Sequence, residues 1–558
     1  MLASDVAATL AKSNAAFFDA DPPSLRLISP IADGADQIAA EVALELGWDL
    51  QVILPFERTS YRSSLANAKS RSGFDALIEQ AIGVLELPGE SEADVDSYVM
   101  AGRATVAHCD ILIAVWDGRP ARGRGGTAEV VQLALTRGTA VIHVAPGNGH
   151  DVRLMWSGFD PNVLTLADEP AVARALDRPH LEQVLSGLLL PPPDEEERDF
   201  IHRFASERLR RIRTRIEYPL MLALVGVRRF GARDFREKHC ADQIRDEWQR
   251  YLSGCANPNS MSAPIASLEH AYSWADRLAT HFAQTYRSGH IFNFVLGGLA
   301  VCIGLSGFMA PQFKFEFAGI ELLITFGIIL NAWIGNRHQW HRRWLDYRQL
   351  AERLRPMRSL KLLGIAAPDP PGTATNPVPR RWIDWYAGSI WRSIGCPAGS
   401  LDPAGAARLA RSIADHEIAP QVAYHHHHAE QIEALDKRLE TIGFSLFLAT
   451  LIVSIATMVG IAENWAFVDR YGDWFNLIQS GFPALGTTVF GIRFQADFGG
   501  DALRSLATAR TLGKIDEEMR RNATLTRAAD LTEQAARVML SDLDEWRLVN
   551  QQRELDYG

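Results

Sequence analysis

Four long apolar stretches stand out from the pattern of hydrophobic and polar positions, all in the second half of the chain. They cover residues 290–310, 317–335, 442–462 and 475–494. About 20 apolar residues in a helix cross the roughly 30 Å hydrocarbon core of a bilayer. The pattern therefore predicts an all-α membrane region with four transmembrane helices, of which the fourth is the most polar. Buried core helices of a large soluble domain are the alternative.

The charges around the four stretches predict their orientation. Short loops at 311–316 and 463–474 join the stretches into two hairpins, and these loops hold more Asp and Glu than Lys and Arg. Basic residues such as Arg287 and Arg337 flank the opposite ends. Basic flanks favour the cytoplasmic side, so both termini and the middle segment of this multi-pass chain are predicted to be cytoplasmic. Glu321, inside the second stretch, is expected either to line a pore or pack against protein, or to reach the membrane surface.

The first 190 residues show a different pattern, in which short apolar runs alternate with segments of helical periodicity. Predicted strands cover residues 25–29, 50–54, 81–87, 111–116 and 140–144, and predicted helices cover 5–18, 36–46, 64–77, 97–109 and 127–137. This alternation is typical of a Rossmann-like α/β domain, with a parallel sheet and helices on both faces. No strand precedes the first helix. Either the domain starts upstream of this sequence, or it lacks its central first strand, whose loss is expected to leave a gap in the sheet.

These patterns divide the chain into five segments. They are the α/β domain at 1–190, a linker with cytoplasmic helices at 191–285, the first hairpin with an amphipathic helix at 286–365, a Pro/Gly-rich linker at 366–405, and the second hairpin with flanking cytoplasmic helices at 406–558. Within the second segment, residues 198–216 predict a basic helix. Its arginines are expected either to face solvent or to contact anionic lipid headgroups.

Composition narrows the classes of function. A hydrophobic content of 47% with 22% charged residues excludes a mainly disordered chain. Five cysteines without a CxxC pair exclude a disulfide scaffold. A net charge of -10 without a basic tract argues against a nucleic-acid partner. The histidine run at 425–428 predicts a polar helix face and no metal site, because four consecutive helical residues point in four directions.

Two strand-to-helix turns of the α/β domain carry residues that suit phosphate binding. The first turn contributes Ser29, Gly34, Ala35 and Asp36, and the second contributes Asp117, Gly118, Arg122, Gly123, Arg124, Gly125, Gly126, Thr127 and Glu129. Ligands of such sheets bind beyond the carboxyl ends of the strands. Glycines let backbone N–H groups approach a ligand, the helix that begins at Thr127 adds unpaired N–H groups, and arginines pair with phosphate. A solvated glycine-rich loop is the alternative.

The two turns also carry a family resemblance. LISPIADGADQIAAEVALELG and LIAVWDGRPARGRGGTAEVVQLA resemble the SLOG branch of Rossmannoid domains, which includes nucleotide sensors and the LOG phosphoribohydrolases. The resemblance implies a nucleotide or nucleotide-derived ligand at these turns. LOG enzymes carry GGxGTxxE, whereas Val130 stands three positions after Thr127 here and the acid is Glu129. This departure argues against hydrolysis; if the protein is an enzyme, Glu129 and Asp117 are the candidate catalytic residues.

A second resemblance covers the first hairpin and its continuation, Tyr347-Arg348-x-Leu-Ala-Glu352-x-Leu-Arg355. This pattern is similar to SLATT-type membrane effectors, which are often joined to nucleotide-sensing domains in bacterial conflict systems. Together the resemblances imply a homo-oligomeric effector in the bacterial inner membrane, where a nucleotide-derived ligand controls pore formation or membrane perturbation in anti-phage defence. A membrane-anchored nucleotide hydrolase of the phosphoribohydrolase or N-glycosidase type, and a membrane interaction scaffold without a ligand, are the alternatives.

Overall fold

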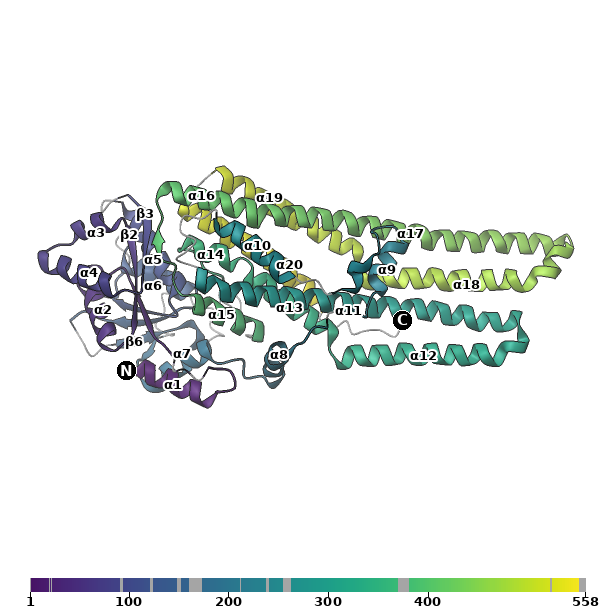
Figure 1. The fold of residues 1–558 in the computed structure, drawn as a ribbon, viewed down its shortest axis with the longest axis horizontal. Helices are drawn as coiled ribbons and strands as arrows, with labels where there is room; N and C mark the ends of the chain where they lie inside the picture. The colour runs from purple at the N-terminus through teal and green to yellow at the C-terminus, as the bar shows by residue number, and fades with distance from the viewer. Residues whose placement is uncertain are drawn as a thin grey trace.

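The computed structural model describes residues 2–550 except 20, 22, 91–93, 121–123, 148–151, 160–172, 211, 237–239, 254–261, 370–380 and 522–523. The molecule is elongated (Figure 1). An α/β region occupies one end, a helical body forms the middle, and four long helices project from the other end. The order of these three parts along the long axis follows the division between soluble and membrane-spanning regions that the sequence predicts.

Two four-stranded sheets form the α/β region in place of one continuous sheet. The first contains β1 (Arg26–Ser29), β2 (Asp49–Phe56), β3 (Gly83–Gly89) and β8 (Gly399–Ser400), in that order and all parallel. The second contains β4 (Ile111–Val115), β5 (Ala140–Val144), β6 (Val152–Met155) and β7 (Ala173–Ala175). Only β4 and β5 are parallel in this second sheet. The prediction of a parallel sheet is thus confirmed for the first sheet and for half of the second.

Among the described residues, no strand of the first sheet pairs with a strand of the second. β1 and β4 are end strands of their sheets, and among the described residues no strand pairs with the outer edge of either. The five strands expected from the sequence are all present, with ends that shift by at most two residues. Strands β6, β7 and β8 were not expected, because they are only two to four residues long.

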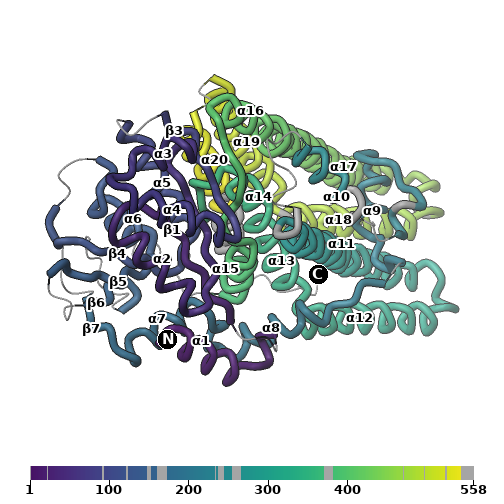
Figure 2. The backbone as a smooth tube through the Cα atoms, turned by 60° about the vertical axis from the view of Figure 1, so that its left-hand side comes forward, coloured from purple at the N-terminus to yellow at the C-terminus, as the bar shows by residue number. Residues whose placement is uncertain are grey.

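Helices cover the two sheets. They are α1 (Leu2–Ser13), α2 (Ala35–Glu45), α3 (Arg58–Ser64), α4 (Ala68–Gln80), α5 (Val95–His108), α6 (Thr127–Thr136) and α7 (Arg178–Leu189). The helix predicted at 64–77 is in fact α3 followed by α4. The Asn67 side chain accepts a hydrogen bond from Ser70 N at 2.9 Å and so starts a new helix. Figure 2 shows α1 beside α7, next to the second sheet, and their apolar side chains form one small cluster.

The helical body shares one hydrophobic core with the first sheet. Its helices are α8 (Glu195–Ser206), α9 (Glu217–Leu224), α10 (Cys240–Ser253), α13 (Trp340–Leu354), α14 (Met357–Leu363), α15 (Trp382–Ile394), α16 (Pro403–Ile413), α19 (Phe498–Arg521) and α20 (Leu525–Asn550). Ile53 and Leu85 of the sheet belong to the same cluster of buried residues as Trp248, Leu350 and Trp382 of the body. The α/β region and the helical body are therefore packed as one unit.

Tertiary contacts give the segments 366–405 and 198–216 structures that differ from the predicted linker and basic helix. The expected linker at 366–405 contains α15, whose Trp382 and Ile383 are fully buried, and β8, which joins the first sheet. The expected basic helix at 198–216 is helical only as far as Ser206. Beyond it, Arg213 Nη1 donates to Gln284 Oε1 at 2.6 Å, and Arg215 pairs with Glu217 at 2.9 Å. Contacts with neighbouring elements thus hold these two arginines, instead of solvent or lipid.

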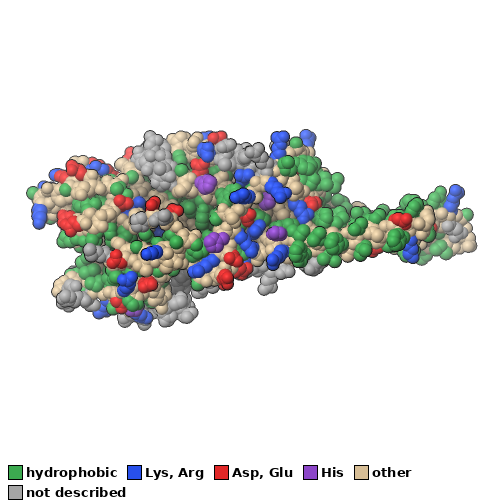
Figure 3. Space-filling model, turned by 60° about the horizontal axis from the view of Figure 1, so that its bottom comes forward, with side chains coloured by type: hydrophobic (Ala, Val, Ile, Leu, Met, Phe, Trp, Pro, Cys, Tyr) green, Lys and Arg blue, Asp and Glu red, His purple; other side chains and the backbone are tan. Residues whose placement is uncertain are grey.

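The projecting helices form two hairpins, α11 (Ser262–Met309) with α12 (Lys314–Arg337), and α17 (Ala419–Ala462) with α18 (Ala466–Ala496). Among the described residues, three segments are long and apolar enough to cross a membrane: Ile265–Met309, Pro311–Arg337 and Pro403–Ala462. The chain is therefore a membrane protein with three candidate spanning helices. The segment 475–494 is helical within α18 but is not among the three, because Gln479, Pro483 and two threonines dilute its apolar character. Figure 3 shows apolar side chains covering the projecting helices.

Candidate functional site

The first predicted turn is held by hydrogen bonds within itself. Ser29, at the end of β1, is buried, and its Oγ accepts from Ile31 N at 3.0 Å. Ile31 adopts a φ of +46°, which is rare for a β-branched residue and typical of turns that position functional groups. Gly34, with a φ of +88°, precedes α2, which begins at Ala35. The Ser29–Ile31 hydrogen bond and the positive φ angles of Ile31 and Gly34 thus set the backbone path of the turn.

Asp36 is the chemically distinctive residue of this turn. Its Oδ2 accepts from Ala32 N at 3.3 Å, and burial raises the pKa of the carboxyl group above its ordinary value. The phenol of Tyr61 on α3 lies nearby, and its own pKa is raised by burial and by the negative charge of Asp36. Desolvation thus favours the neutral form of both groups.

Tyr98 on α5 connects the first turn to the second. Its ring lies edge-on to Phe56, with 6.2 Å between ring centroids, and Phe56 contacts Tyr61 in the same way at 5.4 Å. A Cβ placed on Gly125, in the second turn, would lie 3.4 Å from Tyr98 Cβ. The structure therefore brings the two predicted turns to one edge of the α/β region. Sequence reasoning missed Tyr61 and Tyr98, although both follow strands at the same edge.

The second turn begins at Asp117, whose Oδ1 accepts from Arg119 N at 3.0 Å, and continues through Gly118, with a φ of +75°. Arg122 and Gly123 lie outside the described residues. The Arg124 side chain is exposed at the surface of the turn, where its guanidinium pairs with the carboxylate of Asp96 at 3.0 Å. Helix α6 begins at Thr127, as predicted.

Glu129 and the glycines before it decide what this turn can bind. Glu129 Oε2 accepts from Gly125 N at 2.6 Å, so a carboxylate already occupies one N–H group that a phosphate would use. Gly126 stands in open space, because a Cβ added there would meet nothing within 4 Å. An anion can therefore approach the start of α6 from the side of Gly126 and Thr127. The hydrogen bond from Gly125 N ties the Glu129 side chain to its own turn.

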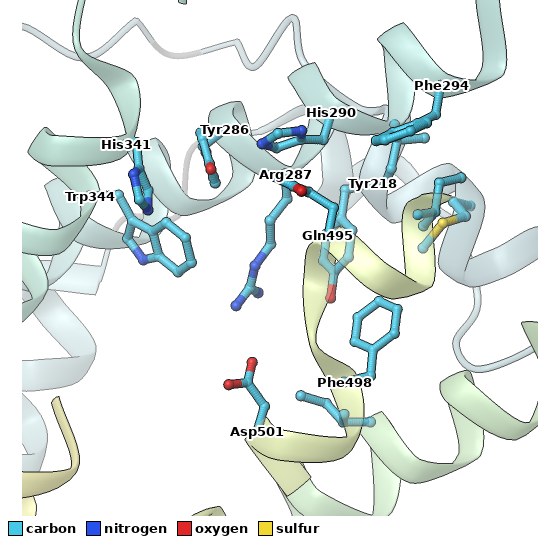
Figure 4. A pocket seen from close by; sticks show the side chains of 14 residues that line it. Tyr218, Tyr286, Arg287, His290, Phe294, His341, Trp344, Gln495, Phe498 and Asp501 are labelled. Atoms are coloured by element: carbon cyan, nitrogen blue, oxygen red, sulfur yellow. The ribbon is translucent and has the colours of Figure 1, made fainter. Parts of the chain in front are cut away.

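A second candidate site lies where the two hairpins meet the helical body, in a cavity of about 80 Å³ (Figure 4). Its walls come from α9, α11, α13, α17, α18 and α19. The guanidinium of Arg287 lies over the rings of Tyr218 and Trp344, at 5.3 and 5.0 Å from their centroids. Figure 4 shows Arg287 of α11 and Asp501 of α19 pointing toward each other across the cavity. The sequence marked Arg287 only as a basic flank of the membrane region.

The protonation of the Asp501 carboxyl group depends on burial and on two nearby arginines. Burial raises the pKa of its carboxyl group, while its ion pair with Arg504 and the charge of Arg287 act in the opposite direction. The cavity therefore places a cation held by aromatic rings, on α11 of the first hairpin, opposite a partly buried carboxyl group on α19 of the helical body. A shift of either helix would change this interaction.

Glu321 and the histidine run, the other positions singled out from the sequence, lie on α12 and α17. A Cβ on Gly304 of α11 would lie 3.2 Å from Glu321 Oε2, so the Glu321 carboxylate faces the neighbouring helix of its own hairpin. Within the histidine run on α17, the His428 ring stacks on Tyr424 with centroids 5.6 Å apart. No group of three or more potential metal ligands occurs among the described residues.

Comparison with protein-family models, with curated proteins and with solved structures finds no match to this chain.

Proposed function

We propose that this protein is a homo-oligomeric effector of the bacterial inner membrane, in which a nucleotide-derived ligand controls the membrane helices. The ligand binds at the strand-end turns around Asp36 and Gly126. The two hairpins, with α18 as the fourth span, form or open the membrane path, and both termini are cytoplasmic. Anti-phage defence is the biological role that the SLOG-like and SLATT-like segments suggest. The apolar surfaces of the projecting helices contact lipid and other copies of the chain.

One observation carries this proposal: helix α11 is unbroken from the core of the helical body to the end of the first hairpin. Its residues Leu268 and Leu278 are buried in the core that includes Ile53 of the first sheet. Further along the same helix, Val295 and Leu299 are exposed by 49% and 43%. A rigid helix moves as a unit, so a displacement at the sheet reaches the membrane without a flexible joint.

The test uses purified full-length protein in liposomes loaded with a fluorescent dye. Metabolites that co-purify with the protein, identified by mass spectrometry, supply the ligand. Ligand-triggered dye release is expected for the wild type and for Glu129→Gln in part, because Glu129 accepts a hydrogen bond from Gly125 N of its own turn. Glu321→Leu is expected to insert normally but to lose release, because intramembrane carboxylates usually face a polar path. Unchanged release in Glu321→Leu would contradict a role of the first hairpin in the path.

A nucleotide hydrolase is the second candidate, and the environment of Asp36 favours it. Burial raises the pKa of this carboxyl group, which suits a general acid, and the phenol of Tyr61 lies beside it. Turnover of nucleoside monophosphates by the purified protein decides between the two functions. A hydrolase requires turnover that falls by about 10²-fold or more in Asp36→Asn and is unaffected by Glu321→Leu. The effector proposal expects no turnover that depends on Asp36.

A further inference from the structure

The cavity at the base of the two hairpins has walls that change from apolar to charged in the same direction (Figure 4). On α11, Phe294 lies within the first of the four apolar stretches, and Arg287 precedes that stretch on the side of the helical body. On the opposite wall, Ile492 lies near the end of the fourth apolar stretch, and Asp501 follows on α19 of the helical body. An apolar end toward the bilayer and a charged end away from it match the shape of an amphiphile held in that bilayer.

Arg287 offers hydrogen-bond donors at the charged end of this cavity. The rings of Tyr218 and Trp344 contact the face of its guanidinium, which leaves the N–H groups at the edge available to an acceptor. Among the described residues, Arg287 donates no hydrogen bond and forms no ion pair. Figure 4 shows the guanidinium pointing into the cavity. An arginine in this position, at the boundary of the membrane region, suits the phosphate of a lipid headgroup.

Asp501 offers an acceptor on the opposite wall. Its Oδ1 accepts from Arg504, and its Oδ2 has no partner among the described residues. The charge of Arg287 acts on the Asp501 carboxyl group, so the two side chains lie near each other. The ion pairs of the described residues nevertheless do not include a direct pair between them. The space that separates Arg287 from Asp501 thus has a donor on one side and an acceptor on the other.

The charges at this end of the cavity restrict the headgroup. Arg504, which pairs with Asp501, also pairs with Asp497 at 3.6 Å, so Arg287, Arg504 and the two aspartates balance to zero. A purely anionic headgroup would bring a second negative charge to Asp501. A choline headgroup has no N–H group to donate. An ethanolamine headgroup carries a phosphate, which only accepts, and an ammonium group, which only donates.

The cavity is large enough for a small polar group but not for a whole lipid. Its volume of about 80 Å³ is several times the roughly 10–15 Å³ that one water molecule needs. Acyl chains exceed this volume and must stay outside. Exposed apolar side chains of α11, such as Val295 and Leu299, are available to them.

We propose that this cavity binds the headgroup of a phosphatidylethanolamine molecule from the leaflet next to the helical body. The phosphate oxygens accept from Arg287, the ammonium group donates to Asp501, and the acyl chains begin at Phe294. The bound lipid joins α11 of the first hairpin to α19, which continues from the second. The proposal requires only that the hairpins enter a bilayer, so it is independent of the nucleotide turns.

Native mass spectrometry of the full-length protein in mild detergent tests the selectivity. The probes are phosphatidylethanolamine, phosphatidylglycerol and phosphatidylcholine with identical palmitoyl and oleoyl chains. One phosphatidylethanolamine per chain is expected to bind with a dissociation constant at least about tenfold below those of the other two lipids. Equal binding of phosphatidylglycerol or phosphatidylcholine overturns the proposal, and so does the absence of any bound lipid.

Soluble phosphoethanolamine separates a lipid from a free metabolite that carries the same groups. Because it lacks acyl chains, it is expected to displace the bound lipid only at a concentration at least about tenfold above that of the lipid. Displacement at an equal concentration overturns the assignment to a membrane lipid.

Variants locate the bound lipid. Arg287→Gln and Asp501→Asn are each expected to raise the dissociation constant of phosphatidylethanolamine at least about tenfold, because each removes a charge-assisted hydrogen bond. Arg337→Gln is the matched control, because Arg337 is an exposed arginine at the corresponding end of α12, outside the cavity. This control is expected to keep the affinity of the wild type. Equal affinity in the wild type and both cavity variants overturns the assignment to this cavity.

A measurement on the wild type alone covers the case in which the cavity variants fail to fold. Phosphatidylethanolamine with a photoreactive group next to its glycerol is incorporated into liposomes with the protein, and the cross-linked peptides are identified after irradiation. Cross-links are expected to concentrate at residues 286–294 and 492–501. Cross-links spread evenly over the exposed faces of α12 and α17 contradict a defined headgroup site.

Discussion

The contact between the two hairpins depends on a glycine. Gly491 of α18 faces Phe294 of α11, and a Cβ added at Gly491 would lie 2.5 Å from Phe294 Cε1 and 2.9 Å from Cδ1. Both distances are far shorter than van der Waals contact, so Gly491→Ala forces the ring or the helix to move. Gly297 of α11 provides the control, because a Cβ there would meet nothing within 4 Å.

The expected magnitude follows from two opposing effects. Replacing glycine by alanine inside a helix stabilises it by up to about 1 kcal/mol. Overpacking of a closely packed contact costs about 1–3 kcal/mol. Gly297→Ala therefore gains up to about 1 kcal/mol, and Gly491→Ala is expected to be about 1–3 kcal/mol less stable than Gly297→Ala.

A double-mutant cycle with Phe294→Leu tests the cause. Unfolding free energies of the wild type, both single variants and the double variant are measured in detergent with increasing denaturant. The smaller side chain of leucine makes room for the new methyl group, so the double variant is expected to be more stable than the sum of the single effects by about 0.5–3 kcal/mol. The reasoning is refuted if Gly491→Ala matches Gly297→Ala, or if the two changes are additive.

Three other predictions concern ligand binding, pH and topology. Gly126→Val is expected to leave the fold intact, because a Cβ at this position meets no other atom within 4 Å. The bulk of valine blocks the N–H groups at the start of α6, so binding of the co-purifying ligand is expected to weaken at least about tenfold in equilibrium dialysis. Burial lowers the pKa of Lys361 to about 7 from the ordinary 10.5. Between these two pKa values the unfolded chain binds more protons than the folded chain, so the free energy of unfolding is expected to rise between pH 7 and 9 by up to about 1.4 kcal/mol per pH unit. Denaturant unfolding of Lys361→Met at several pH values is expected to lose this slope. In cells treated with a membrane-impermeant thiol reagent, Asn464→Cys is expected to be labelled from the periplasm and Ser393→Cys to be protected; the reverse pattern contradicts the orientation.

The two strand-end turns contain features that the sequence predicts and features that depend on the tertiary structure. The start of α6 at Thr127 could be located from the glycines before it and the apolar periodicity after it. The hydrogen bond between Glu129 and Gly125 N could not, because it depends on the path of the turn. The position of Asp36 after the first strand is visible in the sequence, whereas the burial that raises the pKa of its carboxyl group is not.

By itself, the sequence determined the features that depend on short stretches of chain. The five expected strands, the helix start at Thr127, and three of the four expected membrane-spanning helices are encoded by periodicity and apolar length within about 20 residues. Only the tertiary structure decided which distant segments share an environment. It joined the first sheet and the helical body in one core, added β8 to that sheet, and placed Arg287 opposite Asp501. The reason is physical: a pattern states which residues must be buried, but the partners that bury them are selected by packing and charge pairing of the whole chain.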